Sequence, residues 1–148
     1  MKRKASPSSP SRRKAPKAAA VAAAPEPLEM AVAAARAADE RKGEDVLILD
    51  LRGRSPVADF FVIVSGKVEA HLASIGAAVA ERLAALGCRP LSMRESAGLG
   101  GWALMDYGPV VVHAFLPEVR AYYDLDLLWG DVPRVKWQEP GGAAPAGA

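Results

Sequence analysis

The chain of 148 residues is long enough for one domain with a hydrophobic core, and no apolar run approaches the ~20 residues that a transmembrane helix needs. Cys88 is the single cysteine, which excludes an internal disulfide and favours a reducing, cytoplasmic location. The net charge of +2 conceals an asymmetry, because residues 1–17 carry seven Lys or Arg and no acid, whereas the remaining 12 basic and 17 acidic side chains give the rest a net charge of −5.

Both ends of the chain have the composition of disordered segments. Residues 1–27 are Pro, Ser, Ala and Lys/Arg, which cannot bury enough apolar surface to fold, so a disordered basic tail is predicted. The acid-poor, Ser-rich composition also admits a transit peptide, although the prolines oppose an amphipathic helix. Weak contact of the tail with RNA phosphates, or a leader without a role, remain alternatives. Residues 138–148 predict a second flexible tail, leaving 28–137 as the domain.

The first half of the domain predicts a helix, two strands and a second helix. Residues 27–42 are strong helix formers before Gly43, with Leu28, Val32, Ala35 and Asp39 on one side. Residues 45–51 and 59–66 are apolar and of strand length. The second helix carries one apolar stripe that ends before Gly87. The stripe consists of Val68, Leu72, Ile75, Val79, Leu83 and Leu86.

The second half predicts three strands and a short helix. Residues 90–95 form a short strand before a Gly-rich loop, and residues 102–108 and 109–116 form two strands joined by a tight turn. Pro117 starts a helix that ends near residue 124. Short turns imply antiparallel pairs, and the long helix after the second strand allows a parallel or crossover pairing. The fold class is α/β, a mixed sheet of about five strands with helices packed on it.

Few residues suggest catalysis. Asp50, Asp59 and Asp106 lie near strand ends and His113 lies within a strand, as in many active sites. Strand-end aspartates also commonly accept hydrogen bonds from turns, and no nucleophile stands beside an oriented base. We therefore expect no catalytic residue.

No cofactor, metal or specific small molecule is expected either. Asp124 and Asp126 resemble an acidic metal pair, but they follow a helix and have no phosphate-binding loop nearby. Residues 98–101 lack the strand before and helix after that a dinucleotide fingerprint requires. His71, at the flank of the second helix, is expected to pack or to make a surface hydrogen bond.

Aromatic and acidic residues gather in the last third of the domain. Seven of the nine aromatic residues lie between residues 102 and 137, and residues 102–131 hold five acids and one Arg. Strand alternation places Trp102 and Asp106 on one face and Tyr107 on the other, and places His113 and Phe115 together. An acidic aromatic surface suits a basic protein and repels nucleic acid.

Residues 28–135 resemble the ribosomal silencing factor family (RsfS, or Iojap). The resemblance is carried by "VLILDLRGRSPVADFFVIVSG", by "GWALMDYGPVVVHAFLPEVRAYYDLDLLWGDVPRV" and by the long helix between them. The matching positions of the second stretch are Trp102, Asp106, Gly108, His113, Phe115, Arg120, Tyr123, Leu128 and Trp129.

The resemblance implies a nucleotidyltransferase-like fold without catalytic carboxylates. It also implies a factor that binds the large ribosomal subunit through its ribosomal protein fourteen, blocks association with the small subunit and represses translation under nutrient limitation. The sequence leaves open whether the free protein forms a homodimer. The implied partner-binding residues are Trp102, Asp106, Tyr107, His113, Arg120, Tyr123, Asp124, Asp126 and Trp129.

Three positions depart from the family pattern. Val68 and Ala70 replace a Ser or Thr and an Arg at the start of the long helix, so its side-chain cap is missing unless Ser65 supplies it. Pro109 replaces an acid in the tight turn.

Two alternatives to a ribosome-binding factor are a nucleotidyltransferase-like enzyme acting on RNA or nucleotides and a general scaffold for a basic partner. The enzyme would need two Asp residues separated by one residue on a strand, and no predicted strand of this sequence carries such a pair.

Overall fold

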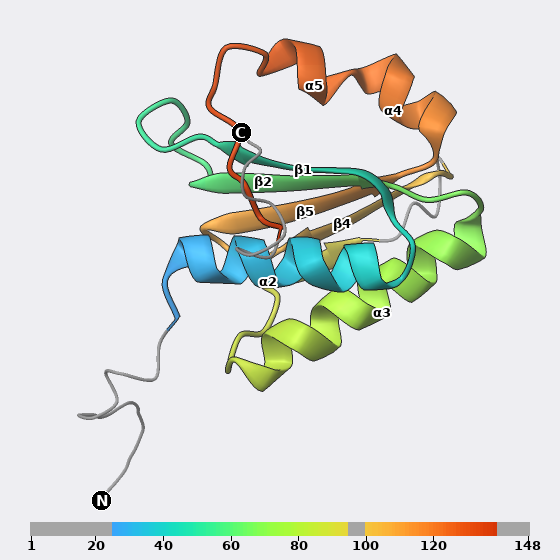
Figure 1. Cartoon of the computed structure of the whole chain (residues 1–148), viewed down its shortest axis with the longest axis horizontal. Coiled ribbons are helices and arrows are strands. Elements are labelled where there is room, and N and C mark those ends of the chain that lie inside the picture. Colours follow the sequence, from blue (N-terminus) through green and yellow to red (C-terminus); the bar gives the residue numbers. More distant parts are fainter. Residues whose placement is uncertain (1–24, 95–99, 139–148) are drawn as a thin grey trace, which may run out of the picture.

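The computed structural model describes residues 25–94 and 100–138. Helices α2 and α3 and a five-stranded sheet form two layers, and the short helices α4 and α5 lie on the opposite side of the sheet (Figure 1). The elements are α2 (Pro27–Glu40), β1 (Glu44–Asp50), β2 (Phe60–Ser65), α3 (Glu69–Ala85), β3 (Ser92–Arg94), β4 (Trp102–Asp106), β5 (Val110–Phe115), α4 (Pro117–Tyr123) and α5 (Leu125–Leu128).

The sheet is mixed, as predicted, with strand order β1-β2-β5-β4-β3. Strands joined by short connections pair antiparallel, namely β1 with β2, β3 with β4, and β4 with β5. The parallel pair is β2 with β5, with Phe60 opposite Val110 and Ser65 opposite Phe115. Helix α3 therefore carries the chain across to the far edge strand β3, and two antiparallel steps bring β5 back beside β2.

Helix α2 packs through a face of small residues. Its buried residues are Met30, Ala31, Ala34, Ala35, Ala37 and Ala38. Of the side predicted to carry Leu28, Val32, Ala35 and Asp39, Ala35 is buried and Val32 packs against the core. Leu28 is 39% exposed and Asp39 is also exposed. Alanine side chains let the helix approach the sheet and α3 closely.

The predicted stripe of α3 is confirmed in its centre. Leu72, Ile75, Val79 and Leu83 are buried, whereas Val68 is the N-cap residue and is 58% exposed. No side chain caps this end of the helix, and the Ser65 hydroxyl accepts a hydrogen bond from Arg120 instead. The helix thus begins without the cap that the Ser65 alternative would have supplied.

The segment after α5 covers the free edge of β1. Asp50 N–H donates to the Pro133 carbonyl, and Val135 N–H donates to the Ile48 carbonyl. The Trp137 indole N–H donates to the Val46 carbonyl over 3.2 Å. This segment closes an edge that would otherwise present unpaired backbone groups.

The predicted disordered tails fall mostly outside the described residues. Residues 1–24 and 139–148 are not described, and α2 begins at Pro27 with Glu26 as its N-cap residue. In the described part of the chain, none of the helices combines the length and the apolarity that crossing a membrane requires.

Candidate functional site

Six rings gather on the side of the sheet that faces away from α2 and α3. We call this surface the aromatic face, and it consists of Phe61, Trp102, His113, Phe115, Tyr123 and Trp129. Four of the rings come from β2, β4 and β5, where strand alternation directs every second side chain to this side. The other two are held over the sheet by α4 and by the residue that ends α5.

The centre of the aromatic face is the pair Trp102 and His113. The Trp102 indole N–H donates to His113 Nδ1 over 3.2 Å, and the two ring centroids lie 5.9 Å apart. The His113 side chain is buried, and burial lowers its pKa from 6.5 to about 4, although the negative charge of Asp106 opposes this shift. His113 is therefore a neutral part of the support beneath Trp102 near pH 7.

The outer rings contact this centre. Tyr123 packs against Trp102 with centroids 4.7 Å apart, and Trp129 meets Phe61 edge to face at 6.3 Å. Trp102 and Trp129 are half-buried, and Tyr123 is 40% exposed. These large rings are thus partly open to solvent but already supported by neighbours, which is how anchor residues of protein interfaces are arranged.

The helices of this surface are fixed by an ion pair. The Arg120 guanidinium donates to both carboxylate oxygens of Asp126, at 3.2 and 3.0 Å, and to the Ser65 hydroxyl at 2.8 Å. These hydrogen bonds hold the pKa of Asp126 below its usual value. Arg120 joins α4 to both α5 and the end of β2, so the predicted site residues Arg120 and Asp126 position the surface.

Asp124 makes the bend between the two helices. It ends α4 in the left-handed conformation at φ +50°, and its carboxylate accepts a hydrogen bond from the Leu127 N–H. Asp and Asn tolerate this conformation better than most residues with a side chain. The bend exposes Tyr122, Leu127 and Leu128, which are 82%, 75% and 67% exposed.

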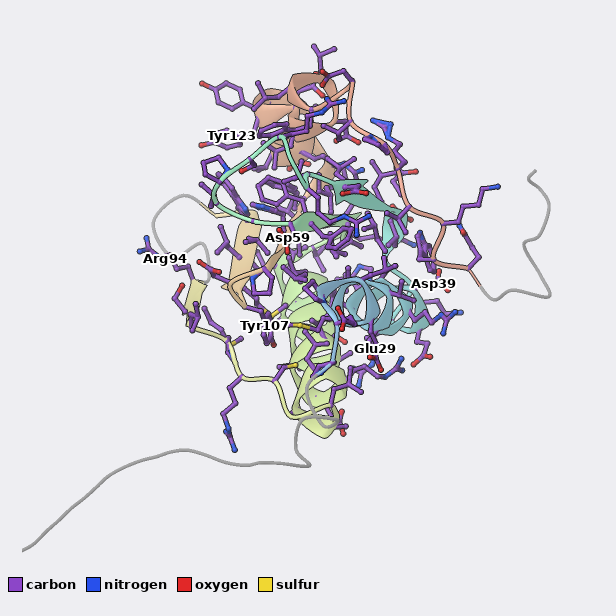
Figure 2. The ribbon with its side chains drawn as sticks, turned by 90° about the vertical axis from the view of Figure 1, so that its left-hand side faces the viewer. Glu29, Asp39, Asp59, Arg94, Tyr107 and Tyr123 are labelled. Carbon is purple, nitrogen blue, oxygen red and sulfur yellow. The ribbon has the colours of Figure 1, made fainter. Side chains whose placement is uncertain are left out.

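Two predicted site residues do not join the aromatic face. Tyr107 is buried in the core on the side of α2, and Figure 2 shows it near the level of that helix, away from Tyr123. Asp106 lies at the far end of β4 from Trp102, where its carboxylate accepts the Gly108 N–H and stabilises the turn. Strand alternation already separates Tyr107 from Trp102, so assigning both residues to one surface disagreed with their geometry.

Sequence reasoning missed several members of this surface. Phe61 follows Phe60 on β2, so one of these two rings had to face away from α2, and alternation was a usable signal. Leu127, which lies beside the aromatic face, gave no such signal, because the four residues of α5 are too few to show a helical period.

Asp50 and Asp106, two of the three carboxylates considered for catalysis, serve an ion pair and a turn of the fold. Asp50 accepts two hydrogen bonds from the Arg52 side chain and one from its backbone N–H. His71, similarly, accepts a hydrogen bond from the Lys67 N–H and contacts the Arg41 carbonyl at 2.7 Å. In residues 25–94 and 100–138 no group of three His, Cys, Asp or Glu side chains is placed to hold a metal ion.

Comparison with known proteins shows similarity to ribosomal silencing factors. The family model described as "Ribosomal silencing factor during starvation" matches residues 24–147. A ribosomal silencing factor of Bacillus subtilis is 39% identical over 100 residues, covering 68% of this chain and 84% of that protein. One from Halalkalibacterium halodurans is 37% identical over 108 residues, covering 73% and 92%.

A solved structure shares the fold. The crystal structure of a protein from Chromobacterium violaceum superposes with a TM-score of 0.67 at 30% identity, covering 84% of this chain and 100% of that one. The family match, the sequence identities and the mixed sheet agree. The chain therefore belongs to the ribosomal silencing factor family.

Proposed function

We propose that the chain binds ribosomal protein fourteen of the large ribosomal subunit, blocks docking of the small subunit and so represses translation when nutrients are scarce. The family consists of non-enzymatic ribosome-binding factors, and membership implies a partner on the large subunit. We also propose that the protein acts in a bacterial cytoplasm, which is supported by the bacterial sources of the relatives described above.

The observation that carries the proposal is the exposed part of the aromatic face. Trp102, Tyr123 and Trp129 present ring surface to solvent while their buried parts rest on other rings. Preorganised Trp and Tyr side chains lose little conformational entropy on binding, which makes them effective anchors. Tyr122, Leu127 and Leu128 extend the apolar area, so the surface fits a protein partner.

The predicted partner-binding residues divide by role. Trp102, Tyr123 and Trp129 contact the partner directly, and Asp124 contributes negative charge that attracts a basic protein. His113, Arg120 and Asp126 act through the residues that they hold in place. For Asp106 and Tyr107 we propose only an effect through the fold, because one stabilises a turn and the other lies in the core.

Co-sedimentation with purified large subunits tests the proposal. Trp102→Ala and Tyr123→Ala should each weaken binding by about thirtyfold, the loss that corresponds to about 2 kcal/mol. Leu91→Ala is the matched control, since Leu91 is 75% exposed on a different part of the surface. Circular dichroism must show that each variant is folded. Normal binding by folded Trp102→Ala and Tyr123→Ala would refute the proposed surface.

The inhibitory step needs its own measurement. Wild-type protein, added to large subunits before small subunits, should reduce the fraction of joined ribosomes in a sucrose gradient. Trp102→Ala should restore joining in proportion to its loss of binding. Binding without any effect on joining would contradict the proposed mechanism while leaving the partner surface intact.

A further inference from the structure

A hollow of about 200 Å³ lies beside the aromatic face, between the start of β4 and helix α4. It opens next to Trp102, the central ring of the proposed docking surface. Its lining residues are Gly100, Trp102, Glu118, Val119, Tyr122 and Tyr123.

Three rings in different orientations surround the hollow. Tyr122 stands perpendicular to Tyr123, with an interplanar angle of 89° and centroids 5.0 Å apart. Tyr123 is tilted by 50° against Trp102. These rings line the hollow, and the face of an aromatic ring attracts a cation placed over it.

A carboxylate completes the lining. Glu118 is exposed at the start of α4, and among the described residues it forms no ion pair with any Lys or Arg. Asp126, by contrast, is already neutralised by Arg120. Glu118 is therefore the negative charge that remains available to a bound group at this hollow.

We propose that the hollow takes one cationic side chain of the basic ribosomal partner, an arginine, with its guanidinium against the rings of Trp102 and Tyr122 and paired with Glu118. The assignment rests on the proposed function, since the hollow is continuous with the proposed docking surface. It is also supported by the net charge of −4 over residues 102–131, where five acids accompany one Arg.

Arginine suits these walls better than other side chains. Its guanidinium is planar, stacks on aromatic faces and donates two parallel hydrogen bonds to a carboxylate. An apolar side chain would cover Glu118 without a partner, and burying an unpaired charge is costly. An acidic group would be repelled by Glu118.

Large-subunit binding of three surface variants tests the hollow. Tyr122→Phe keeps the ring and should bind within about twofold of wild type, whereas Tyr122→Leu keeps an apolar side chain but removes the π face. Because cation–π contacts contribute ~0.5–2 kcal/mol, Tyr122→Leu should weaken binding by about 2- to 30-fold. Glu118→Gln, which preserves shape, should weaken binding and flatten its salt dependence. Equal binding by Tyr122→Phe and Tyr122→Leu, or wild-type binding by Glu118→Gln, would overturn the assignment.

A second measurement does not depend on the ribosome. Tetra-arginine amide, titrated into the full-length protein, should shift the Trp102 indole N–H resonance in wild type and Tyr122→Phe, with smaller shifts in Tyr122→Leu and Glu118→Gln. Tetra-glutamine amide is the neutral control. No shift with tetra-arginine, or an equal shift in all variants, would overturn the cationic site. If wild type responds here but does not sediment with large subunits, the proposed function fails and the cationic site stands.

The basic N-terminal segment of the chain is a competing source of the cation. A full-length variant with the seven Lys and Arg of residues 1–17 changed to Ser should keep the Trp102 resonance of wild type when no peptide is present. A shifted resonance would show that the chain's own segment occupies the hollow, and would overturn the assignment to the ribosomal partner.

Discussion

The indole N–H of Trp102 donates to Nδ1 of His113 over 3.2 Å, across the pair β4 and β5. This bond requires Nδ1 to be an acceptor, so the proton of the neutral imidazole lies on Nε2. Nε2 is buried and has no hydrogen-bond partner among the described residues. If His113 took up a second proton, Nδ1 would carry a hydrogen that points at the indole N–H of Trp102. Two donors would then face each other, so the orientation of Trp102 depends on an uncharged His113.

We therefore predict that acid weakens the fold through His113. Its pKa is about 4 in the folded chain and near 6.5 when exposed, so between these values the unfolded state binds more protons. The contribution is fully present above pH 6.5 and is lost as the pH falls towards 4, a change of about 3 kcal/mol in the free energy of unfolding. Urea unfolding at pH 7, 5.5 and 4 measures it.

The variant His113→Phe isolates this contribution. It keeps an aromatic ring but cannot titrate, so its stability should change much less over the same pH range. Asp126 affects the pH dependence of stability in a lower pH range. Because its pKa is lowered in the folded chain, its contribution to the free energy of unfolding is lost only as the pH falls below about 3.8, the usual pKa of the carboxyl. The same pH dependence in wild type and His113→Phe would contradict the prediction.

Asp126 and Asp124 should differ in their effect on stability although they lie two residues apart. Asp126→Asn removes the charge partner of the Arg120 guanidinium, whose side chain is only 11% exposed, and should cost about 1–2 kcal/mol. Asp124→Asn should change stability by less than about 0.5 kcal/mol, because Asn caps helices and adopts the left-handed conformation equally well. Chemical denaturation of both variants provides the comparison, and equal losses would mean that the ion pair does not fix the helices.

Trp129→Ala should weaken the fold without abolishing it. The ring is half-buried and touches Phe61 edge to face, so its removal should cost about 2 kcal/mol, less than the ~3–5 kcal/mol for a fully buried Trp. Trp129→Phe should recover part of this loss. Thermal unfolding followed by circular dichroism checks both variants, and a Trp129→Ala protein that is unfolded at 25 °C would identify the ring as core and not as a partner anchor.

Removal of residues 1–24 should leave the stability of the fold unchanged but weaken electrostatic attraction to the ribosome. The deletion ends before Glu26, the N-cap residue of α2, so the thermal midpoint should stay within about 2 °C of the full chain. Binding to large subunits should weaken at low salt, and the slope of log affinity against log salt should fall, because fewer Lys and Arg displace counterions from RNA. A drop of many degrees in the midpoint would show that the segment packs on the domain.

Local patterns predicted most of the elements. The buried side of α3 could be predicted because its large apolar residues alternate with small or polar ones, so only one side of the helix can be buried. The same reasoning was less decisive for α2, because alanines lie on every side of that helix and give no contrast between its faces. In the structure, Met30 and five alanines are buried and Leu28 is left exposed.

What the sequence by itself determined is local: the period of each strand and helix, the opposite faces of Trp102 and Tyr107, and the collection of rings and acids in the last third of the domain. Only the tertiary structure decided which of them meet. The parallel pairing of β2 with β5 brings Phe61 to His113, and the Arg120–Asp126 ion pair holds α4 and α5 so that Tyr123 lies on Trp102. Apart from the Arg120–Asp126 pair, these contacts join residues distant in the chain, and no local periodicity encodes them because they depend on how whole elements pack.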